Sequence, residues 1–132
     1  MKQKPILGLA EVRRILDAAH DEAVKNSWAV TIAVADDGGN LLGLLRLDNA
    51  APLSAGIATE KARCSALGRR ETKFYEEMIN GGRTSFLSVP MQGMLEGGVP
   101  IVIDGHTVGA VGVSGVKSDQ DAQIARAGIA AL

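Results

Sequence analysis

The sequence predicts an α+β protein in which a central antiparallel sheet is flanked by helices. Two pairs of apolar, strand-like segments are each joined by a short polar turn, at residues 36–40 and 104–106, which is typical of β-hairpins. Segments with helical spacing stand before, between and after these hairpins, and they do not alternate with single strands. This order excludes a doubly wound nucleotide-binding fold, which needs alternating strands and helices. At 132 residues, the chain is expected to form a single domain over residues 1–132.

The first half of the chain predicts a helix, a hairpin and a second helix. Apolar residues recur at three- and four-residue spacing over residues 7–26, which indicates an amphipathic helix. Residues 28–35 are too rich in β-branched side chains for a helix and predict a strand, with the return strand at 41–47. The return strand is almost entirely apolar, so both of its faces are expected to be covered. Pro52 suits the first turn of a helix that continues to about Leu67.

The second half predicts a short helix, a long loop, a hairpin and a final helix. Residues 71–80 have helical character, and the glycines that follow end the helix. Residues 83–99 show no period and are expected to form an ordered loop that includes a helical turn. The second hairpin is expected at 100–104 and 107–115. The last helix is expected over 119–132, opened by a capping box at Ser118.

Composition and charge exclude several classes of function. Fourteen basic residues against fifteen acidic ones give a net charge of −1 without a basic run, which argues against a nucleic-acid partner. The chain has no signal-peptide pattern and no apolar run long enough to cross a membrane, so a cytoplasmic protein without membrane contacts is expected. The single cysteine, Cys64, allows neither an internal disulfide nor a cysteine-based metal site.

His20 is the first candidate for a functional residue. It lies at the margin of the buried stripe of the first predicted helix, next to Leu16 and Ala23 in helical spacing. One interpretation is a boundary polar residue that bonds to solvent or backbone. The other is a neutral imidazole that ligates a metal. One histidine is too few for a tetrahedral zinc site, whereas a haem iron needs only one or two ligands from the protein.

Arg46 and Lys61 are the other charged candidates. Arg46 ends an apolar strand, where it either reaches water or binds a carboxylate with its planar fork. Lys61 lies in the middle of the second helix, and its default position is the solvated face. His106 is expected at a solvated hairpin tip, and Cys64 on the buried side of its helix.

Several segments taken together resemble the GlcG/HbpS family, which includes haem-binding proteins and the C-terminal domain of PduO-type proteins. The resemblance spans nearly the whole chain. It rests on residues 34–42 with Arg46 and Asp48, Lys61-Ala62, Gly97-Gly98-Val99-Pro100, Asp104-Gly105 with residues 108–115, and Asp121 with residues 125–128. It implies a profilin-like fold, homo-oligomers that can reach an octamer, and, in some relatives, bound haem. His20 is the best match to a family haem-ligand histidine.

Three functions remain open from the sequence. The first is an oligomeric protein that binds a small ligand, with haem as the candidate cofactor, and that the resemblance associates with the catabolism of small oxygenated compounds. Its ligand-binding candidates are His20, Arg46, Lys61, Gly97 and Gly98, and a loop with Met91 and Met94 is expected to wall an apolar pocket. The alternative is an enzyme or accessory factor for a small carboxylate, with Arg46 as clamp and Lys61 or Asp36 in proton transfer. The third is an assembly protein without a ligand.

Overall fold

The computed structural model describes residues 1–132 and has the element order that the sequence predicts. The helices and strands are α1 (Leu9–Lys25), β1 (Thr31–Asp36), β2 (Leu41–Arg46), α2 (Leu53–Gly68), α3 (Thr72–Asn80), the 3₁₀ helix η1 (Thr84–Ser88), β3 (Gly98–Ile103), β4 (His106–Ser114) and α4 (Ser118–Ile129). The four strands form one antiparallel sheet in the order β2-β1-β4-β3. The predicted α+β class is confirmed.

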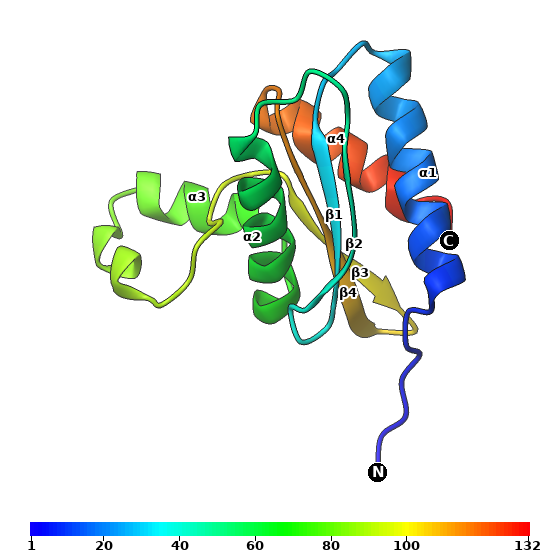
Figure 1. Ribbon diagram of the computed structural model, residues 1–132. Coiled ribbons are helices and arrows are strands. Elements are labelled where there is room, and N and C mark those ends of the chain that lie inside the picture. Colours follow the sequence, from blue (N-terminus) through cyan, green and yellow to red (C-terminus); the bar gives the residue numbers. More distant parts are fainter.

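The sheet lies between two helical layers (Figure 1). Helices α1 and α4 cover one face and α2 covers the other, while α3 and η1 extend away from α2 as a side lobe. The main core fills the space between the sheet and the α1–α4 layer. Its fully buried large side chains are Ile15, Val30, Ile32, Val34, Ile101, Val111, Val113 and Ile124. These positions follow the helical and strand periods that the sequence shows.

The other face of the sheet is almost flat, and α2 packs directly on it. Four alanines make this contact, from β1 and from α2: Ala33, Ala35, Ala58 and Ala62. Gly112 of β4 lies against the α2 backbone, and a Cβ atom there would overlap the carbonyl oxygen of Ala58 and the amide nitrogen of Ala62. The glycine and alanine content of the chain therefore permits a close helix-on-sheet approach.

The expectation that β2 is covered on both faces is wrong. This strand pairs only with β1 and forms an edge of the sheet. Leu41 is 50% exposed and Leu45 is 37% exposed. An unbroken apolar run indicates a strand but does not place it in the sheet, because pairing with distant segments decides which strand lies at the edge.

The remaining differences concern element ends. Strand β3 begins at Gly98, so the predicted loop is shorter than expected, and η1 supplies its helical turn. His106 is half-buried and begins β4, so it does not lie in a solvated tip. Lys117 takes the N-cap position expected for Ser118, and Gln120 accepts the hydrogen bond from its backbone amide. No helix combines the length and the apolar character that a membrane span requires.

Candidate functional site

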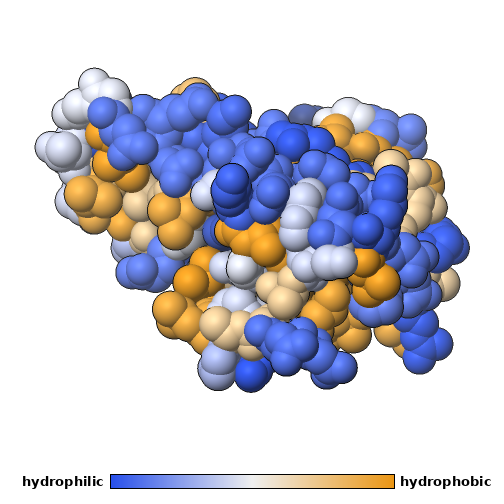
Figure 2. Space-filling model, turned by 90° about the horizontal axis from the view of Figure 1, so that it is seen from above, coloured by the Kyte–Doolittle hydropathy of each residue, from blue (hydrophilic) through white to orange (hydrophobic).

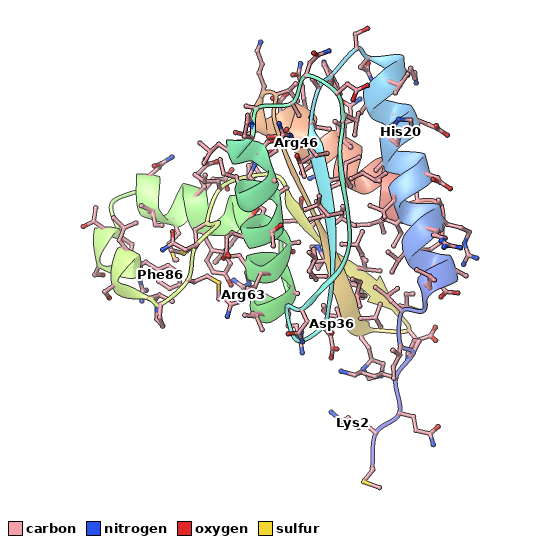
Figure 3. The ribbon with its side chains drawn as sticks, viewed as in Figure 1. Lys2, His20, Asp36, Arg46, Arg63 and Phe86 are labelled. Atoms are coloured by element: carbon pink, nitrogen blue, oxygen red, sulfur yellow. The ribbon has the colours of Figure 1, made fainter.

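His20 and Arg46 line a common cleft between the C-terminal half of α1 and the end of β2. The register of the sheet pairs Arg46 with Thr31, which places the arginine at the strand end. Figure 3 shows both side chains at the same end of the molecule, on neighbouring elements. They share a hollow of about 360 Å³, and His20 also lines an adjoining hollow of about 320 Å³. The two hollows have His20, Leu47 and Asp48 in common and are described below as the His20–Arg46 cleft.

The close approach of α1 to β2 creates this arrangement. Gly43 faces α1, where an added Cβ atom would lie 2.9 Å from Val12 Cγ1 and 3.0 Å from Leu16 Cδ1. Because glycine leaves this space to the helix, α1 packs closely on the edge strand. His20 follows Leu16 by one helical turn and so projects beyond the packed part of α1.

The His20–Arg46 cleft has an apolar part and a charged part. The more apolar part contains Ala23, Val24, Trp28 and Ala29, with Leu47 at the junction, together with the polar residues Ser27, Asp48 and Asn49. The charged part contains Asp17, Arg46 and Asp48. Such a combination of apolar walls with a few polar groups is typical of small-molecule sites.

The two candidate ligand-binding side chains of the cleft are free of internal partners. The His20 side chain is 47% exposed, and its nearest charged neighbour is Asp21, with 3.7 Å between Nδ1 and Oδ1. This separation is too long for a hydrogen bond, so both ring nitrogens remain available. Arg46 makes no hydrogen bond and no ion pair within the chain, although its guanidinium carries five donors.

Lys61 does not lie on a solvated helix face, and that expectation is wrong. Its side chain is 4% exposed, and Nζ donates to the carbonyl oxygen of Val113 at 2.9 Å and to Oδ2 of Asp121 at 3.2 Å. The carboxylate of Asp121 also accepts from the amide of Val116 at 3.2 Å. Burial raises the pKa of Asp121, and the charge of Lys61 opposes this rise.

Gly97 and Gly98 surround the buried lysine and do not line the His20–Arg46 cleft. A Cβ atom on Gly97 would lie 2.7 Å from Nζ of Lys61, and one on Gly98 would lie 2.5 Å from the Lys61 carbonyl oxygen. Thr72 holds this segment: its hydroxyl donates to the carbonyl oxygen of Leu95 and accepts from the amide of Gly98 at 2.9 Å. Lys61 and the two glycines therefore meet in the interior of the protein.

Arg46 does not meet Lys61 or Asp36 in one pocket of the chain. Lys61 lines none of the hollows, and Asp36 ends β1 at the opposite end from Thr31, the partner of Arg46. Figure 3 shows Asp36 at the far end of the sheet from Arg46. The carboxylate clamp with a nearby proton-transfer group, as expected for an enzyme, is not formed within one chain.

Met91 and Met94 line an apolar hollow elsewhere, in the side lobe. This hollow of about 130 Å³ also contains Cys64 and the stacked rings of Tyr75 and Phe86, which lie 5.5 Å apart. Burial raises the pKa of the Cys64 thiol to about 11. The expected apolar pocket at this loop therefore exists, but without Gly97 and Gly98 in its lining.

The sequence did not identify several residues of these sites. They are Trp28, Leu47, Asp17 and Asp48 of the cleft, and Asp121, the acidic partner of Lys61. For Trp28 a signal was available, since it is the chain's one tryptophan and follows His20 by eight residues, just after the first helix. For Asp121 the signal was weak, because an aspartate in the first turn of a helix is ordinarily exposed and favoured there by the helix dipole.

The structure contains no group of three or more His, Cys, Asp or Glu side chains able to hold a metal ion. A haem makes a smaller demand, since a single axial nitrogen and an apolar wall hold it to the protein. His20 has an imidazole nitrogen that could serve in this way, and Trp28, Val24 and Leu47 line the hollow beside it. The residues of the His20–Arg46 cleft are therefore of the kinds that could hold a haem.

The fold and the cleft define the class of the protein: a small α+β domain with a four-stranded antiparallel sheet and an open, partly apolar cleft that contains a histidine. A family model described as haem degrading protein HbpS-like matches residues 7–130. The chain belongs to this GlcG/HbpS family.

Individual relatives agree with this assignment. Protein GlcG of Escherichia coli K12 is 59% identical over 114 residues, which cover 86% of this chain and 85% of GlcG. A double mutant of Streptomyces reticuli HbpS has a similar structure, with a TM-score of 0.89, 32% identity, and coverage of 100% of this chain and 90% of the other. The PduOC:haem complex has a TM-score of 0.88 at 25% identity, with coverage of 97% and 96%.

Proposed function

We propose that the protein binds haem in the His20–Arg46 cleft, with the imidazole of His20 as the axial ligand of the iron. The observation that carries this proposal is that His20, with both ring nitrogens free, opens into a cleft that has an apolar wall. Membership of a family described as haem-degrading, and the similarity to a protein crystallised with haem, support the choice of ligand.

The chain's own residues have distinct tasks in this proposal. Trp28 and Leu47 would pack against the ring and exclude water, while His20 would bind the iron. The haem supplies the redox and oxygen-binding chemistry of its iron when bound. The cleft covers only part of a porphyrin in a single chain, because its hollows measure about 320 and 360 Å³ and open to solvent.

Titration of the purified protein with haem, followed by absorption spectroscopy, tests the proposal. We expect a shifted Soret band that saturates at one haem per chain. His20→Ala is expected to lose this band, whereas His106→Ala is expected to keep it, because His106 lies on β4 and lines no hollow of the structure. An unshifted Soret band, or identical spectra for wild type and His20→Ala, would contradict the axial-ligand assignment.

Self-association into a homo-oligomer, up to an octamer, is part of the same proposal. Exposed leucines on the edge strand and at the start of α2 support it, since Leu41 is 50% and Leu53 is 72% exposed. Figure 2 shows a further gathering of apolar groups over the side lobe, where Phe74 and Leu87 are exposed. A light-scattering mass equal to that of one chain would contradict self-association.

The cellular setting is proposed from the family. An association with the catabolism of small oxygenated compounds, and a cytoplasmic location, are what the resemblance and the sequence suggest. The enzyme alternative, with Arg46 and Lys61 acting on one carboxylate, has no support from the arrangement in one chain, because the two side chains do not share a pocket.

A further inference from the structure

We propose that Arg46 makes the cleft selective for planar apolar ligands that carry a carboxylate, and that Arg46 binds this carboxylate while the ring lies against Trp28. In haem, the carboxylate is a propionate. This inference rests on the proposed function and specifies which chemical group of the ligand each part of the cleft recognises.

The first support is the division of the cleft. Residues of α1 and of the segment before β1 form the apolar part, around Val24 and Trp28, whereas Arg46 lies in the charged part. His20, Leu47 and Asp48 belong to both parts. A ligand that is held through His20 can therefore reach both environments, and burial of its ring favours the apolar side. Its charged substituents are then directed toward Arg46.

The second support is the unpaired charge of Arg46. The guanidinium has no hydrogen bond and no ion pair within the chain, although Asp17 and Asp48 line the same hollow. Its planar fork matches a carboxylate with two parallel hydrogen bonds, an arrangement that a lysine ammonium cannot make. A carboxylate ligand therefore finds these donors unoccupied.

The two aspartates sharpen this selectivity. They repel any anionic group that is not paired with Arg46, so a carboxylate is stabilised only where it contacts the guanidinium. Removing one of these negative charges is therefore expected to strengthen the binding of a carboxylate ligand. It is not expected to affect a ligand without charge.

The experiment compares ferrous haem with ferrous haem dimethyl ester, which has the same ring and iron but neither a carboxylate nor a net charge. For Arg46→Gln we expect about tenfold or greater loss of affinity for haem, the effect of losing charge-assisted hydrogen bonds, and less than about twofold loss for the ester. Arg46→Lys is expected to lose part of the affinity for haem. Asp48→Asn is expected to bind haem more tightly than wild type, because it removes a negative charge from the cleft.

Arg13→Gln is the matched control, because Arg13 is an exposed arginine of α1 that lines no hollow. It removes the same charge and is expected to leave both affinities unchanged. Equal losses for haem and ester in Arg46→Gln, or a comparable loss of haem in Arg13→Gln, would overturn the role of Arg46 while leaving the haem site itself in place. A wild-type protein that binds neither compound would overturn the proposed function and this inference together.

Discussion

The ammonium of Lys61 lies 3.2 Å from Oδ2 of Asp121, and both side chains are almost completely buried, at 4% and 3% exposure. The pair joins α2 to α4, two helices that cover opposite faces of the sheet (Figure 1). Nζ of Lys61 also bonds to the backbone of β4, so three elements meet at one ammonium group. Lys61 thus fixes the two helical layers to the sheet at the end of β4.

Replacement of Lys61 by methionine is expected to lower the free energy of unfolding by about 3–5 kcal/mol, because it leaves the charge of Asp121 buried without its partner. Chemical denaturation measures this change. Lys73→Met is the control, since the Lys73–Glu77 pair is exposed and its loss is expected to cost less than about 0.5 kcal/mol. A Lys61→Met protein as stable as the control variant would show that the buried pair is not needed for the fold.

Removal of the Cys64 thiol is expected to change how stability depends on alkaline pH. Burial raises the pKa of this thiol from 9.0 to about 11, so the folded protein holds the proton more tightly than the unfolded chain. The resulting stabilisation is complete below pH 9 and is lost as the pH rises through about 11. Unfolding free energies of wild type and Cys64→Ala, measured from pH 8 upward, should therefore show a steeper decline for wild type. Parallel curves would exclude a raised pKa.

The local patterns predicted the elements well, and non-local packing explains what they missed. The helical period of α1 and the turn residues of both hairpins depend on neighbouring residues, and these elements are confirmed. The burial of Lys61 could not be predicted in this way, because it depends on an acidic partner 60 residues later in the chain. The proximity of His20 and Arg46 likewise depends on how α1 packs against an edge strand.

Gly112→Ala is expected to destabilise the protein by about 3 kcal/mol, because the added methyl group overlaps the backbone of α2, which cannot move aside as a flexible side chain can. Gly56→Ala provides the contrast. Gly56 lies within α2, and the position that a Cβ atom would take is open space, so alanine is expected to raise stability by about 0.5–1 kcal/mol through helix propensity. Thermal unfolding of both variants distinguishes them. Similar effects of the two substitutions would contradict the close contact between α2 and β4.

Thr72→Val is expected to cost about 1–3 kcal/mol, since it leaves the buried amide of Gly98 and the carbonyl oxygen of Leu95 without their hydroxyl partner. Thr72→Ser keeps the hydroxyl and is expected to retain most of the stability. Hydrogen exchange at the Gly98 amide reports the same contact, with faster exchange expected in the valine variant only. A valine variant as stable as wild type would show that the two hydrogen bonds of the hydroxyl do not contribute to stability.

Gly43→Ala tests whether the packing of α1 on the edge strand creates the His20–Arg46 cleft. The added methyl group would lie 2.9 Å from Val12 Cγ1 and 3.0 Å from Leu16 Cδ1, so these side chains or the helix must shift. We expect a loss of stability of about 1–3 kcal/mol, as for other overpacked sites, together with weaker haem binding, because His20 moves with α1 relative to Arg46. Val12→Ala in the same chain is expected to restore part of both losses by making room for the methyl group. Haem binding that stays at the wild-type level in a destabilised Gly43→Ala protein would show that the cleft does not depend on this contact.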